Sequence, residues 1–297
     1  MDPQIYAAID VGSNSVRLLI ARAQHGKLIR LCSDRSTTRL LNGVKDGFLI
    51  GEPVENTAQA VARFVNMARE AGAAHIDAFG TSALRDAKNA DSFSDRTEAL
   101  CGLRVKVISG VDEAQLAFAG AAPFGKCGVI DIGGGSTELI VGKDGQMLRA
   151  HSAQVGAVRL MNLLEGRQNP QEMYETACRL LEHTVNTVCT ELPERWVGVG
   201  GTITTLAAMS KQVSKYSPNA IADYPLTEEC TESWLYRLCG MSYEERCTLI
   251  GLQPSRADVI AFGAAVLLAV IRMTHAEAVH ACDHDNLEGY IRRCMMH

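Results

Sequence analysis

The sequence predicts an α/β protein built from two related lobes, and three observations support this fold class. A strand-like apolar run, an aspartate and a glycine turn with hydroxyl side chains occur around Asp10 and recur around Asp131. The two copies align without a gap, and each is followed by another glycine and a third strand-like run. Helical patterns and strand-like runs then alternate along the rest of the chain. Each copy therefore predicts one strand–turn–strand–turn–strand unit of its own lobe.

The length and composition agree with two globular domains. The chain has 297 residues, with 47% hydrophobic and 21% charged residues, which is typical of a folded globular protein. We expect a first lobe at 1–123, joined by the C-terminal helix 286–297, and a second lobe at 124–285.

Charge and cysteine usage exclude several classes of function. The net charge of −5 attracts no polyanion to the protein as a whole, so nucleic acid is not an expected partner and phosphate needs a local basic cluster. The ten cysteines show no CxxC pair, which predicts reduced thiols in the cytoplasm. The N-terminus has no basic region, and the longest apolar run, Val259–Ile271, has only 13 residues. We therefore expect neither a signal peptide nor a membrane role.

Glycine turns are the candidate anion-binding elements. Consecutive glycines let the backbone approach a ligand with its N–H groups, and neighbouring hydroxyls add donors. An ordinary glycine-rich hairpin is the alternative, and the second copy of the turn argues against it. A third turn opens a helix, whose N-terminus favours an anion. The candidates in the second and third turns are Gly133, Gly134, Gly135, Ser136, Thr137, Gly200, Gly201 and Thr202.

Two charged residues fall in predicted first helical turns. A Thr-Ser pair suits a helix N-cap and places Arg85 in the first turn, where the helix dipole disfavours a cation. Arg85 then either binds an anion or is exposed and pairs with Asp86 or Asp91. Glu113 opens another helix after a strand and a glycine, where it either complements the dipole or faces a ligand.

A third group of polar residues alternates along a predicted strand. His280, Cys282 and His284 then share one face, as metal ligands could. Since no fourth ligand is nearby in the sequence, the end of a strand is the favoured interpretation.

Five motifs, in this order, resemble those of the exopolyphosphatase / guanosine pentaphosphate phosphatase family. They are Asp10-Val-Gly-Ser-Asn-Ser, Gly80-Thr-Ser-Ala-Leu-Arg-Asp-Ala, Ser109-Gly-x-x-Glu-Ala, Asp131-Ile-Gly-Gly-Gly-Ser-Thr-Glu and Gly198-Val-Gly-Gly-Thr-x-Thr-Thr-Leu. The resemblance extends through Arg256-Ala-Asp-Val-Ile and is to the short form of the family, without a C-terminal HD-type domain.

The resemblance implies both a fold and an activity. The fold is actin-like and sugar-kinase-like, with two lobes that each hold a mixed five-stranded sheet and face an interdomain cleft. The activity is hydrolysis of the terminal phosphoanhydride of inorganic polyphosphate or of pppGpp, with Mg²⁺ or Mn²⁺ as cofactor. A homodimer is the family expectation.

The resemblance also implies roles for single residues. Glu113 matches the family's catalytic glutamate, a general base that deprotonates the attacking water. Arg17 and Arg85 match family arginines that bind neighbouring phosphates. The turn residues that match phosphate-binding positions are Ser13, Asn14, Ser15, Gly134, Gly135, Ser136 and Thr137.

The metal is expected on carboxylates. Asp131, with Asp10 and Glu138 as helpers, would hold a hard cation through oxygen and water ligands. The chain departs from the family near its C-terminus, where Leu287 replaces an arginine and removes a group that could touch substrate or a lobe interface.

Two other functions fit the same pattern. A phosphotransferase (kinase) of the same superfold has similar phosphate loops, and the motif around Glu113 favours a hydrolase over it. A nucleotide-binding structural protein of this superfold is the other alternative. The predicted base and metal carboxylates argue against it.

Overall fold

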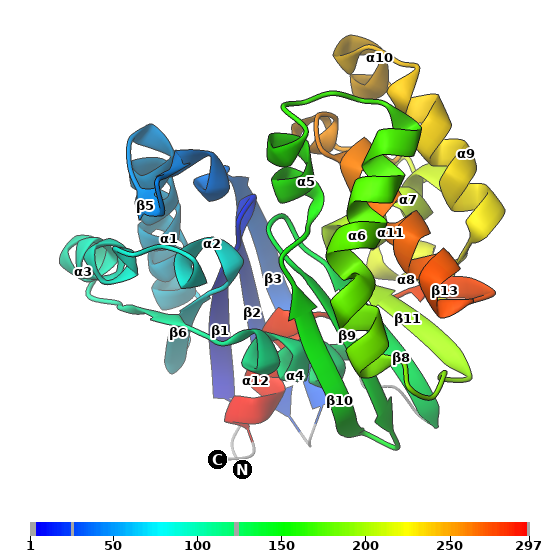
Figure 1. Cartoon of the computed structure of the whole chain (residues 1–297). Coiled ribbons are helices and arrows are strands. Elements are labelled where there is room, and N and C mark those ends of the chain that lie inside the picture. The colour runs from blue at the N-terminus through cyan, green and yellow to red at the C-terminus, as the bar shows by residue number, and fades with distance from the viewer. Residues whose placement is uncertain (1–3, 25–26, 122–124, 296–297) are drawn as a thin grey trace. The chain divides into compact units, whose positions relative to one another are not determined.

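The computed structural model describes residues 4–24, 27–121 and 125–295 (Figure 1). The chain divides into two compact units: unit 1 is Met1–Gly120 with Asn286–His297, and unit 2 is Ala121–Asp285. The predicted boundary between 123 and 124 lies outside the described residues. The C-terminal helix follows unit 2 in the sequence and packs in unit 1.

Unit 1 contains a mixed five-stranded sheet in the order β3-β2-β1-β6-β7. The first three strands pair antiparallel, while β6 and β7 run parallel to β1. The strands are β1 Gln4–Val11, β2 Ser15–Gln24, β3 Lys27–Thr37, β6 His75–Gly80 and β7 Val105–Val107, with a separate small pair, β4 Val44–Lys45 and β5 Phe48–Leu49.

The helices of unit 1 cover this sheet. They are η1 Leu40–Gly43, α1 Glu52–Glu70, α2 Ser82–Arg85, α3 Ala90–Cys101, α4 Gly110–Ala121 and α12 Asn286–Cys294. Ala8 and Leu19 of the sheet form a core with Leu116 of α4 and Tyr290 of α12. A side chain at Gly289 would overlap the Leu116 carbonyl oxygen, so only glycine permits this close approach of α12 to α4 (Figure 1).

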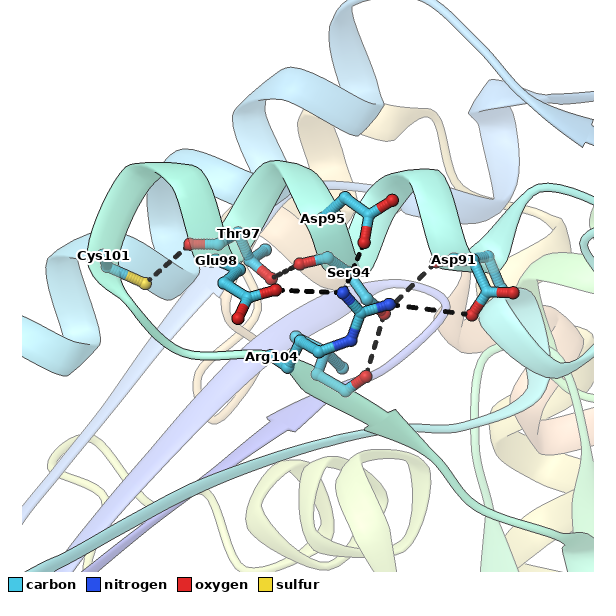
Figure 2. A network of polar contacts seen from close by, with 9 residues as sticks. Asp91, Ser94, Asp95, Thr97, Glu98, Cys101 and Arg104 are labelled. Atoms are coloured by element: carbon cyan, nitrogen blue, oxygen red, sulfur yellow. Dashed lines mark hydrogen bonds and ion pairs between the residues drawn. The ribbon is translucent and has the colours of Figure 1, made fainter.

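Polar contacts tie α3 to β7 at the edge of the sheet (Figure 2). Arg104, directly before β7, pairs with Asp95 and, at 2.9 Å, with Glu98. The Ser94 hydroxyl donates to the carbonyl oxygen of Val105 over 2.9 Å. Because the carboxylates are largely exposed, the ion pairs stabilise this edge only modestly.

Unit 2 repeats the strand order of unit 1 and adds one strand. Its sheet has the order β10-β9-β8-β11-β13-β12, so it has six strands where five were predicted. The extra strand, β12, pairs antiparallel with β13 and directly precedes a helix in the sequence. The strands are β8 Lys126–Ile132, β9 Thr137–Lys143, β10 Gln146–Ala153, β11 Arg195–Val199, β12 Pro225–Thr227 and β13 Ala278–Ala281. The shared order confirms that the two units repeat one strand plan.

The helices of unit 2 surround one long buried helix. They are α5 Ala157–Leu163, α6 Pro170–Val188, α7 Gly200–Ser210, α8 Pro218–Ile221, α9 Glu228–Cys239, α10 Tyr243–Cys247, η2 Pro254–Arg256 and α11 Ile260–Thr274. Helix α11 is buried over almost its whole length, as its apolar sequence predicts. A 3₁₀ turn at Pro254–Arg256 precedes it. Among the described residues, no helix is both long and apolar enough to cross a membrane.

Candidate functional site

Three connections meet at one edge of the unit 1 sheet. Val11, Gly80 and Val107 are register neighbours at the carboxyl ends of the parallel strands β1, β6 and β7. The segments that follow these strands carry the first glycine turn, Arg85 and Glu113. Since ligands of open α/β sheets bind beyond the carboxyl ends of the strands, this edge is the candidate site of unit 1.

The first turn is closed by its own backbone and leaves polar side-chain atoms uncommitted. The Gly12 N–H donates to the Ser15 carbonyl over 3.1 Å, and the Ser13 and Asn14 carbonyls accept N–H groups from segment 38–41. Within the described part of the chain, Ser13 Oγ and Asn14 Oδ1 are buried and have no hydrogen-bond partner. Buried polar atoms are normally satisfied, so this arrangement supports a polar ligand at the turn.

Asp10 and Arg17 form an ion pair across strands β1 and β2. They are register partners, and Arg17 Nε donates to Asp10 Oδ2 over 3.1 Å. Both side chains are largely buried. The positive charge of Arg17 therefore balances the negative charge of Asp10, which was predicted to help hold the metal.

Arg85 pairs with Glu113 and with neither of the aspartates that the sequence suggested. Arg85 Nη1 lies 2.8 Å from Glu113 Oε2 and also donates to the Ile108 carbonyl over 3.3 Å. Helix α2 spans only Ser82–Arg85, so the prediction that Arg85 lies in the first turn is confirmed, and the arginine also ends this single turn. Its charge is thus well placed for the helix dipole, and the carboxylate of Glu113 determines its orientation.

Neighbouring carboxylates at the start of α4 have different partners. Asp112 is partly exposed, and its Oδ2 accepts the Ser109 hydroxyl over 2.7 Å, as an end-of-helix carboxylate commonly does. Glu113 is 5% exposed and faces Arg85. The guanidinium therefore holds the carboxylate of Glu113 in place at the start of α4.

The turn of unit 2 reproduces that of unit 1. The Gly133 N–H donates to the Ser136 carbonyl over 3.0 Å, and segment 157–159 donates to the Gly133 and Gly134 carbonyls. Arg159 Nε also donates to the Gly135 carbonyl. Within the described residues, no hydrogen bond engages the N–H groups of Gly134 and Gly135. These two donors remain available to an anion.

Two predicted hydroxyl donors have structural contacts. The Thr137 hydroxyl donates to the Val155 carbonyl over 2.6 Å, which uses its single proton. Thr202 packs on α11, since a Cβ at Gly263 would lie 2.7 Å from Thr202 Oγ1. Both side chains therefore make packing contacts within unit 2.

Asp131 and Glu138 are the paired carboxylates of unit 2. They are register partners on β8 and β9, and they are 5% and 1% exposed. Glu138 Oε1 accepts the Ser152 hydroxyl over 2.6 Å. Gly200, at φ +82°, lies directly against Asp131 Oδ1, where a Cβ would collide with the carboxylate. Two buried like charges directly opposite one another disfavour the sheet unless a cation or a proton joins them.

Hard oxygen ligands of this kind fit Mg²⁺. In the described ranges, no three His, Cys, Asp or Glu residues group closely enough to enclose a metal ion. Mg²⁺ commonly keeps several waters and uses one or two protein carboxylates beside substrate phosphates, and Asp131 and Glu138 are ligands of that kind. The sequence also suggested His280 as a possible metal ligand. In the structure, His280 Nδ1 lies 3.2 Å from Asp223 Oδ1.

Arg256 is the residue that sequence reasoning missed. Its guanidinium lies over the first turn of α7, where a Cβ at Gly201 would overlap it. Arg246 Nη1 supports this segment by donating to the Ala257 carbonyl over 3.1 Å, and burial lowers the pKa of Arg246. A cation at a helix N-terminus is disfavoured by the dipole and becomes favourable with an anion between them. The only sequence signal was the place of Arg256 in the last shared motif.

Comparisons with known proteins agree with this arrangement. The profile of the Ppx/GppA phosphatase family matches residues 19–296. Exopolyphosphatase 2 of Mycobacterium tuberculosis is 36% identical over 95% of this chain and 96% of that protein. Guanosine-5'-triphosphate,3'-diphosphate pyrophosphatase of Vibrio parahaemolyticus is 28% identical over 97% of this chain and 58% of that protein. The crystal structure of the Aquifex aeolicus Ppx/GppA family member has a TM-score of 0.83 at 29% identity, covering 99% of this chain and 98% of that one. The chain therefore belongs to the Ppx/GppA phosphatase family.

Proposed function

We propose that this protein is a metal-dependent phosphohydrolase that releases the terminal phosphate of inorganic polyphosphate or of pppGpp. The observation that carries the proposal is the ion pair of Arg85 with Glu113 beside the first glycine turn. It joins a base to an anion-binding group at the carboxyl edge of a sheet. The similar proteins named above, an exopolyphosphatase and a pppGpp pyrophosphatase, support this substrate class.

In the proposed reaction, Glu113 takes a proton from the attacking water. The water oxygen bonds to the terminal phosphorus as the bridging P–O bond breaks, and the electron pair leaves with the remaining phosphate chain. Arg85 holds phosphate oxygens while its Nη1 stays with Glu113. General-base assistance of this kind accelerates a reaction by roughly a hundred- to ten-thousand-fold.

In unit 2, the residues support binding of the charged substrate. The N–H groups of Gly134 and Gly135 would donate to phosphate oxygens, with Arg256 at the start of α7 as a further cation. Asp131 and Glu138 would hold Mg²⁺ or Mn²⁺, which offsets the negative charge of the phosphates when bound. Asp10 is a weaker metal candidate because Arg17 already balances its charge.

Two further features belong to the proposal. The ten cysteines form no disulfide in the described part of the chain, which supports a cytoplasmic location. A homodimer follows from the family resemblance, and light scattering of the purified protein at micromolar concentration would measure it.

Initial rates of phosphate release test the function. The substrates are tripolyphosphate, long-chain polyphosphate and pppGpp, each with Mg²⁺, with Mn²⁺ and with excess chelator. We expect metal-dependent phosphate release from at least one substrate. Transfer of phosphate from ATP to an acceptor without release to water would instead show a kinase, and nucleotide-dependent polymers without turnover would show a structural protein.

A further inference from the structure

A row of charged side chains crosses three strands of unit 1. Asp10 on β1 is the register partner of Arg17 on β2, and Arg17 is the register partner of Arg35 on β3. Directly opposite residues share one face of a sheet. This face also carries Ala8 and Leu19, which pack with Leu116 of α4. The row therefore lies on the side of the sheet that is covered by the helix bearing Glu113.

The chain after β3 wraps around the first glycine turn. The N–H groups of Thr38 and Arg39 donate to the Asn14 carbonyl over 3.1 and 2.9 Å. The Thr57 hydroxyl of α1 donates to the Thr38 hydroxyl over 2.9 Å, and Thr57 is fully buried. Arg39 is thus held at a fixed place beside the turn, with its backbone bonded to the turn itself.

Arg39 has a backbone conformation that an arginine rarely adopts. Its φ of 52° and ψ of 46° lie in the left-handed region, which is unfavourable for a residue with a side chain. Glycine or asparagine would accept this conformation more easily. Local backbone geometry therefore gives no reason for an arginine here.

We propose that Arg35 and Arg39 form a second anion subsite beside the Ser13–Ser15 turn. It binds phosphate groups of a linear phosphoanhydride chain beyond the one that is released. This inference rests on the proposed function and adds the part of the substrate that unit 1 recognises. Both side chains are partly exposed, and a guanidinium fork can bind two phosphate oxygens at once.

Charge supports the same subsite. Arg17 and Arg35 are register partners on β2 and β3, and the backbone of Arg39 is bonded to the turn, so three arginines lie in this part of unit 1. The whole chain carries a net charge of −5, so the cluster is opposite in sign to the rest of the protein. A local basic cluster is what a polyanionic substrate needs on an acidic protein.

The test uses variants that keep the backbone intact. Arg39→Asn removes the guanidinium and keeps a residue that tolerates the left-handed region, while Arg35→Gln removes the charge within β3. Arg63→Gln is the control, because Arg63 is an exposed arginine of α1 in the same unit, 3.9 Å from Asp34. Steady-state kinetics on tripolyphosphate, long-chain polyphosphate and pppGpp would be measured, together with calorimetric binding of long-chain polyphosphate in chelator.

For each subsite variant, we expect KM for long-chain polyphosphate to rise about tenfold with little change in kcat, the effect of losing one hydrogen bond to a charged group. Tripolyphosphate should respond less, the calorimetric Kd should weaken in parallel, and Arg39→Lys should recover part of the loss. An equal rise for pppGpp would assign the subsite to the phosphates of the nucleotide.

Unchanged KM values, or an equal loss of kcat on every substrate, would overturn the subsite. Should Arg39→Asn unfold, Arg35→Gln decides alone. The proposed function fails separately, if the wild-type protein releases no phosphate from any of the three substrates.

Discussion

Arg85 Nη1 and Glu113 Oε2 lie 2.8 Å apart, so the proposed phosphate-binding residue and the proposed base form an ion pair. Among the described residues, Arg85 Nη2 is buried and has no hydrogen-bond partner. The Arg85 guanidinium can therefore donate to Glu113 through Nη1 and to a phosphate oxygen through Nη2.

Arg85→Lys should lower kcat/KM for polyphosphate by about 10- to 100-fold, because an ammonium keeps the charge and loses the fork that binds two partners. Steady-state phosphate release measures this. Arg96→Lys, an exposed arginine paired with Glu55 in the same unit, should leave kcat/KM unchanged. Equal rates for Arg85→Lys and wild type would remove Arg85 from the site.

Glu138→Gln should weaken metal binding by about tenfold or more, since it removes one of two carboxylates and keeps an oxygen for the Ser152 hydroxyl. Electron paramagnetic resonance of Mn²⁺ measures the dissociation constant independently of activity. Glu244→Gln, an exposed glutamate of unit 2, is the matched control. The metal assignment is contradicted by a Mn²⁺ affinity that equals that of the wild type.

Gly289→Ala should destabilise unit 1 by about 1–3 kcal/mol, because the added methyl group overlaps the Leu116 carbonyl. The urea midpoint of unfolding measures this loss. Gly240→Ala is the control: its nearest atoms would lie 3.6 Å away and its φ is −81°. A Gly289→Ala midpoint as high as that of the control would mean that α12 does not pack on α4 this closely.

Stability should fall as the pH drops below about 6.5, in part because of His151. Burial first and His183 second lower the pKa of His151, so the folded state binds its proton less readily than the unfolded chain. Its stabilising contribution is complete above the unfolded pKa and is lost as the pH falls toward the folded one. Thermal melts between pH 7.5 and 5 should show a smaller acid loss for His151→Gln than for wild type; identical slopes would exclude His151.

The sequence predicted what depends on local backbone and periodicity. The glycine turns at Ser13–Ser15 and Gly133–Thr137 follow from residue types that favour tight turns. The shared strand order follows from the internal repeat. These features need no knowledge of distant contacts.

The contacts that define the candidate site could not be predicted from local sequence. Arg85 and Glu113 are 28 positions apart, and only the fold brings them together. Arg256 reaches Gly201 across an even longer separation. The sequence also did not show that α2 ends at Arg85, because the residues directly after Arg85 include no proline or glycine to mark the end.

The most direct test of Glu113 as the base is phosphate release by Glu113→Gln, compared with Asp112→Asn. The two carboxylates are adjacent, and only Glu113 faces Arg85, whereas Asp112 bonds Ser109. At saturating polyphosphate and Mg²⁺, we expect kcat of Glu113→Gln to fall by about 10²- to 10⁴-fold and Asp112→Asn to stay near wild type. A folded Glu113→Gln protein that releases phosphate at the wild-type rate would contradict the account.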